Sequence, residues 1–535
     1  MPRPGRIAQS NRGSVQGAAK QTSAPLTYPA PTLGLVTTAS MGAAPSGSAS
    51  ILENWMMTLT GARVRGGSVR RSLAADGGAI RSAFKYKYGG LEKMFMATNS
   101  GIYDMTAPAA PPATTAAAVS GLASGDWCAF QQTNAGTSYL VCFNGTDDRR
   151  LFNGVSWGTS PAITFSDSTT MASLNYGWIF KNRQFLIKNG SLDAYYLDLN
   201  AVGGAALVFP LGGVLKKGGS LLMGFSWSIE SGDGPNEYCA FVTTEGEVAI
   251  YSGSNPSDAN DFALKGVYQI GKPLGKNAQI KSGSDVLVAT IDGLTPISQI
   301  FQRDRQTLAL VSMSRAIEKE WKIAANAVPR GWTLTLWPEQ NLVFVAFPEN
   351  TVLPDTTFVF NVLNNKWSII KNWAASAYQT LQGSLFFGSI GGYCWQGDTS
   401  GSDNGAPFFA TYLSQFTAAG EFSQEKTASK AQMSFRAKTE PNVKLFARAD
   451  YDLSRPSYGV VSVGDAGSSE WDVGLWDVGK WDGVSEAKNF KFRQNVRANG
   501  EMLAVGCVIL SSGAFRLDCE VDFAIMQVES GEQSA

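Results

Sequence analysis

The residues of this chain that could act on a ligand are arginines and lysines grouped near its start. Four lie within the first twenty residues, Arg3, Arg6, Arg12 and Lys20, and four more lie in the stretch RVRGGSVRRS, Arg63, Arg65, Arg70 and Arg71. Clustered guanidinium groups suit phosphate or an acidic partner surface. In a β-strand, alternation would place Arg63 and Arg65 on one face. The alternative is a solvated edge strand whose charges prevent aggregation.

Acid–base and metal chemistry have few candidates. The chain contains no histidine, which excludes Ser-His-Asp and Cys-His arrangements and imidazole zinc sites. Paired carboxylates, as in glycosidases, remain possible. The segment SGDGPNEY, residues 231–238, resembles an Asp-box turn but has Pro235 where the box requires glycine. We therefore interpret such acids as turn residues, and we predict no catalytic residue, no metal ligand and no cofactor.

The cysteines are predicted to be free thiols in the core. None of the six has CxxC spacing, and four lie in apolar, strand-like runs, where a thiol behaves as a small hydrophobe. Cys507 and Cys519 alone are placed like partners across a hairpin. Free thiols fit assembly in a reducing cytoplasm. The start lacks an apolar signal core, and no stretch approaches about 18 apolar residues, so neither secretion nor a membrane span is predicted.

The strands that must position the basic residues are predicted from a repeated sequence pattern. From Lys93 to Trp395 one phrase recurs about seven times: an apolar strand, a turn with Gly or Asn, and a second strand that often ends in an aromatic residue, as in KMFMATNSGIYD and YLVCFNGTDDRRLF. The copies are about 35 to 63 residues apart, which is typical of a β-propeller. The 57 glycines and the 16% of charged residues suit short strands and tight turns. The predicted fold class is all-β, with a propeller of six or seven blades.

Composition divides the chain into three parts. Residues 1–50 are rich in Pro, Gly, Ser, Ala and Thr and predict an extended basic N-terminal arm, ordered only where another chain or domain holds it. Residues 51–420 are the β-propeller. Residues 421–535 alternate over longer strands and predict a C-terminal β-sandwich. Residues 1–90 hold eleven Lys or Arg against two acids, so an excess of nine acids must lie further on, because the whole chain is neutral.

Local features of the propeller are also predicted. Residues 63–70 and 80–88, with the following hairpin, should complete a four-stranded first blade. The Pro- and Ala-rich run 107–121 should connect the first two blades. Residues 314–325 predict a single insertion helix. The sequons at Asn144 and Asn189 are interpreted as Asn-Gly hairpin turns.

The C-terminal domain contains the repeat WDVGLWDVGKWDG, with Trp471, Trp476 and Trp481 five residues apart. An odd spacing turns successive side chains of a straight strand to opposite faces, so a flat sugar-binding platform does not follow. We predict successive Asp-Gly turns, each anchored by a packed Trp.

Several long phrases resemble one protein family. LENWMMTLTGARVRGGS, residues 52–68, the segment 209–256, GVYQIGKPLGK, residues 266–276, and SGSDNGAPFFATY, residues 400–412, are similar to tail nozzle, tail tubular or tail hub proteins of short-tailed bacteriophages. The resemblance spans nearly the whole chain. It implies a virion tail protein assembled in the host cytoplasm.

The resemblance also implies partners. It implies a homo-hexameric ring below the portal and head-to-tail adaptor protein, associated with tail fibre or tailspike proteins, whose lumen passes viral DNA at ejection. The eight basic residues named above are then possible adaptor or phosphate contacts. Because strong positive charge would hold DNA back through phosphate contacts, we expect a neutral to acidic lumen. The resemblance supplies no catalytic residue. The alternative hypothesis is a receptor-binding or glycan-hydrolysing tail protein that uses the propeller as its active domain.

Overall fold

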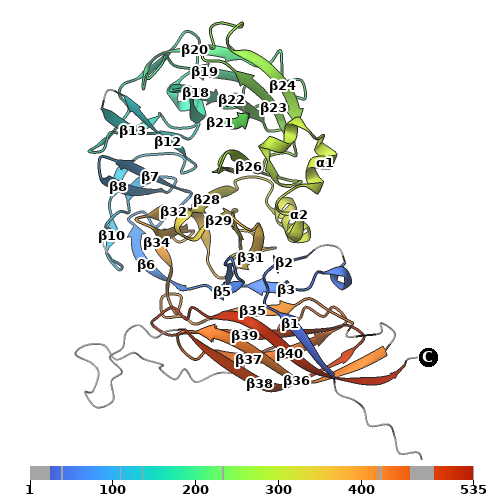
Figure 1. The fold of residues 1–535 in the computed structure, drawn as a ribbon. Helices are drawn as coiled ribbons and strands as arrows, with labels where there is room; N and C mark the ends of the chain where they lie inside the picture. Colours follow the sequence, from blue (N-terminus) through green and yellow to red (C-terminus); the bar gives the residue numbers. More distant parts are fainter. Residues whose placement is uncertain are drawn as a thin grey trace, which may run out of the picture.

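The computed structural model describes residues 24–37, 40–108, 110–134, 136–231, 234–418, 420, 424–457 and 487–533, and the structural statements below concern these residues. The described chain is almost entirely β, and its strands form eight sheets. Seven sheets succeed one another around a ring, and one of these seven continues into a two-layered sandwich that the eighth completes (Figure 1). The prediction of an all-β propeller with a sandwich is confirmed.

The first four sheets of the ring are antiparallel meanders. The first comprises β7 (Ser82–Tyr88), β8 (Leu91–Ala97), β9 (Gly101–Asp104) and β11 (Ala117–Ser120). The second comprises β12 (Cys128–Asn134), β13 (Thr137–Phe143), β14 (Arg150–Phe152) and β15 (Trp157–Gly158). The third comprises β17 (Leu174–Phe180), β18 (Arg183–Lys188), β19 (Asp193–Tyr196) and β20 (Gly204–Pro210), with β16 (Ile163–Phe165) parallel to β20. The fourth comprises β21 (Leu221–Ser231), β22 (Gly234–Thr243), β23 (Glu247–Ser252) and β24 (Ala263–Gln269).

Three further sheets complete the ring. The fifth has the strands β25 (Gln279–Ser282), β26 (Asp285–Thr290) and β27 (Gly293–Pro296). The sixth has β28 (Thr333–Trp337), β29 (Leu342–Ala346), β30 (Thr357–Asn361) and β31 (Lys366–Ile370). The seventh has β32 (Ala375–Leu381), β33 (Ser384–Ser389), β34 (Tyr393–Ser400), β6 (Gly67–Ala74) and β10 (Thr114–Thr115). First strands of successive sheets touch, except that the fourth sheet meets the fifth through β21 and β26, and β32 of the seventh returns to β7 of the first.

The ring is closed by a strand from the start of the propeller. Strand β6 pairs antiparallel with β34, so the seventh sheet joins two segments that are more than 300 residues apart. Such pairing ties the two ends of the ring together, because neither end can leave without breaking a ladder of backbone hydrogen bonds. The predicted first blade is therefore wrong in one strand, since residues 67–70 close the last sheet and β11 completes the first. The run 107–121 likewise contributes β10 and β11 and is more than a connector.

Helices occur where the fifth sheet leads to the sixth. Helix α1 (Arg305–Leu310) begins after Asp304, whose carboxylate accepts a hydrogen bond from the Thr307 backbone, as N-cap residues do. Helix α2 (Glu318–Ala327) follows a 3-10 turn and buries Trp321 against Trp332 and Trp367. The insertion helix predicted over residues 314–325 is confirmed, with a later start, whereas α1 is an additional element that the sequence analysis missed.

The sandwich is assembled from both ends of the chain. One layer contains β1 (Ala24–Pro29), β4 (Trp55–Met57), β5 (Ala62–Val64), β36 (Gln424–Ala437), β38 (Lys488–Gly500) and β40 (Glu520–Gln533). The other contains β2 (Gly34–Leu35), β3 (Ser48–Glu53), β35 (Phe408–Ser414), β37 (Asn442–Ala449) and β39 (Leu503–Ser511), and continues through β3 into β31 of the sixth blade. The propeller is thus inserted into the sandwich.

This topology corrects the predicted domain boundaries. The domain boundaries at residues 50 and 420 do not separate the sheets, because strands before residue 65 and after residue 407 form one sandwich. The described part of the arm is held by another domain of the same chain, one of the two possibilities predicted: β1 pairs with β40, and buried Tyr28 donates a hydrogen bond to the Leu503 carbonyl. The sequence does not predict this strand, because it contains two prolines, Pro25 and Pro29, and proline argues against a strand.

One hydrophobic core runs through the sandwich and into the propeller. It contains Met433 and Phe435 of β36 and Val505 of β39, together with Trp321 and Phe358 near the sixth blade. A fully buried large apolar side chain stabilises a fold by about 1.5–3 kcal/mol relative to its exposed state, so each of these residues favours keeping the two parts joined.

The cysteines and the Asn-Gly turns lie as predicted. All six cysteines are buried free thiols. Burial raises the pKa of Cys128 to about 11 and that of Cys394 to about 12, which disfavours reactive thiolates. Gly145 and Gly190 have φ of +80° and +72°, conformations that glycine adopts readily in tight turns. The Trp-Asp repeat, with Trp471, Trp476 and Trp481, lies outside the described residues.

Candidate functional site at the junction of propeller and sandwich

The structure separates the predicted basic site residues into three groups. Arg3, Arg6, Arg12 and Lys20 lie outside the described residues. Arg70 and Arg71 of β6 are exposed. Arg63 and Arg65 are buried, with exposed fractions of 8% and 0%, where β5 of the sandwich leads into β6 of the propeller. Buried charges require partners, because removing an ion from water without one is costly, and the partners of these two arginines form the candidate site.

Arg63 is paired with Asp398 at the end of β34. Its two terminal nitrogens donate to the two carboxylate oxygens at 3.0 and 2.8 Å, a bidentate arrangement. The same carboxylate accepts the Gly66 backbone N–H at 2.6 Å and Arg516 Nη1 at 2.9 Å. The Asp398 side chain is completely buried. One carboxylate therefore joins β5, the chain before β6 and the segment before β40.

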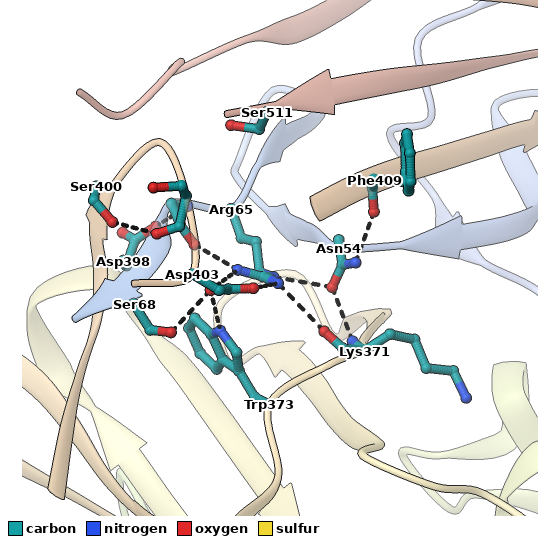
Figure 2. A network of polar contacts seen from close by, with 12 residues as sticks. Asn54, Arg65, Ser68, Lys371, Trp373, Asp398, Ser400, Asp403, Phe409 and Ser511 are labelled. Atoms are coloured by element: carbon teal, nitrogen blue, oxygen red, sulfur yellow. Dashed lines mark hydrogen bonds and ion pairs between the residues drawn. The ribbon is translucent and has the colours of Figure 1, made fainter. Parts of the chain in front are cut away.

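Arg65 makes a second pair with Asp403. Its terminal nitrogens donate to Asp403 Oδ1 and Oδ2 at 3.0 and 2.7 Å, and its Nε donates to Asn54 Oδ1 at 2.9 Å (Figure 2). The guanidinium carbon lies 3.8 Å from the Phe408 ring centroid and 4.8 Å from that of Trp373. Such stacking offsets part of the cost of burying the guanidinium in a place that water does not reach. Arg65 is therefore held on its edge by oxygens and on its faces by aromatic rings.

Neighbouring polar groups complete the network. Asn54 donates from Nδ2 to the Phe409 carbonyl and accepts the Lys371 backbone N–H at Oδ1, at 2.7 and 2.8 Å. Ser68 donates its hydroxyl to Asp403 at 2.8 Å. Figure 2 shows these side chains converging on Arg65 and Asp403 from several segments of the chain. The arrangement connects groups that are already fixed by backbone structure, so its physical effect is to fasten the propeller to the sandwich.

The hypothesis that Arg63 and Arg65 contact an adaptor or phosphate is therefore wrong for this fold. Each is enclosed and already paired with a carboxylate, so neither is available to an external anion. The solvated-edge alternative is wrong too. The signal that sequence analysis missed is the pair of acids in residues 398–403, which lie 335 and 338 positions away from their partners. Arg70 and Arg71 remain accessible.

The exposed arginines border an aromatic hollow. Arg70 lies over the rings of Tyr393 and Trp395, at 4.4 and 4.9 Å from their centroids, and Arg71 Nε donates to Gln396 at 2.7 Å. A hollow of about 250 Å³ adjoins Arg70. It is lined by Ser68, Arg70, Asn372, Trp373, Ala374, Phe387, Ser389, Ile390, Gly391, Tyr393, Trp395 and Asp403.

The hollow beside Arg70 does not hold a pair of carboxylates. It contains one carboxylate, that of Asp403, which is paired with Arg65. Burial and the neighbouring Asp355 raise the pKa of Glu349, but this residue lies exposed on the loop after β29. No group of three His, Cys, Asp or Glu side chains that could hold a metal ion occurs in the described part of the chain. No helix there is long and apolar enough to span a membrane.

The chain was compared with protein families, curated proteins and solved structures. Neither the protein-family models nor the curated proteins contain a match to the chain. Solved structures that resemble it include the computationally designed Ika8 protein (9% identity, TM-score 0.33, 62% of this chain and 99% of that chain), Chaetomium thermophilum Raptor (10%, 0.36, 65% and 29%) and BBS1N in complex with ARL6DN (9%, 0.37, 65% and 98%). At these TM-scores the propeller assignment rests on the order of the sheets.

Proposed function

We propose that this chain is a structural subunit of a short-tailed bacteriophage tail, with six copies forming a nozzle ring below the portal and adaptor. The ring closes the DNA channel in the virion and passes DNA at ejection. Tail fibres or tailspikes attach around it, and the ring assembles in the host cytoplasm before it joins the virion. The chain acts by holding shape and surfaces, and no catalytic step is assigned to it.

One observation carries the proposal. Two of the phrases that resemble tail proteins, residues 52–68 and 400–412, are far apart in sequence but meet at the junction, where Arg65 of the first pairs with Asp403 of the second. Domains within a chain usually move relative to one another unless their interface is large and apolar. Here a buried ion-pair network, a shared core and a continuous sheet oppose such motion. A subunit that must keep a channel aligned requires this rigidity.

Ring assembly sets further requirements. A closed ring uses a head-to-tail contact, so each subunit presents two different complementary surfaces. The lumen should be neutral to acidic, because a strongly basic lumen would retain DNA. Purified full-length protein, imaged by electron microscopy alone and with its adaptor, should form rings with six-fold symmetry. Persistent monomers under both conditions, or an open filament, would contradict the proposal.

The basic arm provides a second test. Deleting residues 2–20 should leave the thermal melting temperature of the monomer nearly unchanged, because β1, which pairs with β40, begins only at Ala24. The same deletion should weaken ring formation or adaptor binding, because the basic arm is then missing from the contact. Differential scanning fluorimetry and analytical ultracentrifugation measure the two effects. Unfolding of the monomer on deletion would show that the arm belongs to the subunit's own fold.

The enzymatic alternative has its own measurement. A glycan-hydrolysing tail protein releases saccharide from host envelope polysaccharide, and one Asp or Glu substitution abolishes that release. We expect no release by the purified protein. Release that is lost on such a substitution would replace the structural proposal with the enzymatic one.

A further inference from the structure

The outer face of the sandwich carries a row of positive charge. The sheet of β36, β38 and β40 buries one side against the rest of the sandwich and turns the other outward, on the side away from the propeller (Figure 1). Outward positions of β36 and β38 hold five exposed cations, which we call the cationic strip: Lys430, Arg436, Lys491, Arg493 and Arg497.

The strands themselves determine this orientation. On β38, Phe490, Phe492 and Val496 pack against the core, so the alternate residues Lys491, Arg493 and Arg497 point outward. On β36, Met433 and Phe435 are buried, and Lys430 and Arg436 belong to the opposite face. The strip thus follows from two aligned strands and does not depend on any loop.

The five cations outnumber the acids near them. Two acids of β40 lie on the same side: Glu520 is opposite Arg436, and Asp522 accepts a hydrogen bond from Ser434 at 3.2 Å. Across the β36–β38 ladder, Lys430 faces Asn495, Gln432 faces Arg493, Ser434 faces Lys491 and Arg436 faces Asn489. No like charges face each other directly, a placement that avoids repulsion. None of the five cations forms a salt bridge with a residue that the structure describes. Gln432 Oε1 accepts hydrogen bonds from Arg493 at 2.7 and 3.1 Å, which orients that guanidinium without neutralising it.

Protection of a sheet edge does not explain the strip. Charged residues on edge strands prevent strands of other molecules from pairing, and β38 is such an edge. Lys430 and Arg436, however, lie on β36, which is paired on both sides, with β38 and β40. An interior strand has no open edge to protect. Edge protection therefore accounts for the cations of β38 and not for those of β36.

We propose that the cationic strip binds the phosphate backbone of duplex DNA without regard to sequence. Lys491 and Arg497 lie about 20 Å apart along β38 at about 3.3 Å per residue, a length that covers about six base pairs at 3.4 Å per step. Asn489, Asn495 and Gln432 lie between the charges, and amide donors bind phosphate oxygens as cations do. None of the large exposed apolar side chains of the described chain lies on β36 or β38, although a protein partner would use such anchors. On β40, Phe523 and Ile525 lie opposite Ser434 and Gln432 and are half-buried.

Salt dependence gives a quantitative test. Binding of the full-length protein to a fluorescent 30-base-pair duplex should weaken with salt, with a slope of log K against log[NaCl] of about −4.5 if all five cations contact phosphate, at about 0.9 per contact. The variant K491Q/R493Q/R497Q should lower the magnitude of that slope by about 2.7. The melting temperature should not change, because these side chains are exposed.

The control removes the same charge elsewhere. Lys87, Lys265 and Arg330 are exposed on the propeller, and K87Q/K265Q/R330Q should leave both affinity and slope unchanged. The proposal is overturned if this control weakens binding as much as the strip variant does, if the wild type does not bind duplex DNA at 50 mM NaCl, or if anionic phospholipid vesicles bind and DNA does not. Residues 458–486 hold six acids and one lysine. If DNA binds only after these residues are deleted, the acidic segment occupies the strip in the intact protein, and the proposal is overturned.

Discussion

Asp398→Asn should lower the free energy of unfolding by about 3–5 kcal/mol, the cost of breaking a buried ion pair by removing the charge of one partner. The carboxylate is fully buried and holds Arg63, Arg516 and the Gly66 N–H at once. Asparagine keeps the size and still accepts hydrogen bonds at one oxygen. It also tolerates the φ of +58° at this position, so backbone strain does not contribute to the loss.

The matched control is an exposed pair. Glu318 and Lys322 lie four residues apart on α2, with 38% and 57% of their side chains exposed, so Glu318→Gln should cost only about 0.3–0.5 kcal/mol. Urea unfolding of both variants, followed by tryptophan fluorescence, compares the two losses. If Asp398→Asn is as mild as the control, the buried network does not fasten the propeller to the sandwich, and the rigidity assigned to the proposed ring subunit loses its main support.

The sequence predicted the propeller because each blade repeats a local pattern. Strands such as β8 and β9 or β18 and β19 are neighbours in the chain and in the sheet, and their turns are marked by residues such as Gly190. Both strands and the turn of such a hairpin lie within one short stretch of sequence, so the residues of that stretch are enough to predict it. The insertion helix was predictable for the same reason, since its period lies within ten residues.

Contacts between distant segments were not predictable in this way. Strand β6 has the same alternation whether it completes the first sheet or the seventh, and only the three-dimensional fold selects β34 as its partner. Arg63 and Arg65 alternate with apolar residues as a surface strand does, and nothing near them in sequence indicates Asp398 or Asp403. Residues 24–29 contain two prolines and resemble a linker, yet they pair with β40. Each of these three errors concerns a partner that lies hundreds of residues away.

The same junction depends on a close backbone approach at Gly67. This residue begins β6, which closes the ring, and faces the turn after β34 that carries Asp403. A Cβ atom at position 67 would lie 2.0 Å from the Ser402 carbonyl oxygen and 2.4 Å from its carbonyl carbon. Both atoms belong to the backbone, so no side chain can rotate away to make room. The turn or the strand must move instead, and Ser68 and Asp403 would move with it.

Gly67→Ala should therefore destabilise the protein by about 3 kcal/mol, the upper part of the range for overpacking a rigid site. Gly213→Ala is the control, because a Cβ there meets nothing within 4 Å, and we expect its free energy of unfolding to change by no more than about 0.5 kcal/mol. Urea midpoints of the two variants measure the difference. Limited proteolysis should also cleave the Gly67 variant faster than the wild type in the strands near its N-terminus. These strands are less firmly held when β6 no longer closes the ring. Equal midpoints for the two variants would mean that the turn at Ser402 yields freely, and the ring would then not depend on this contact for its closure.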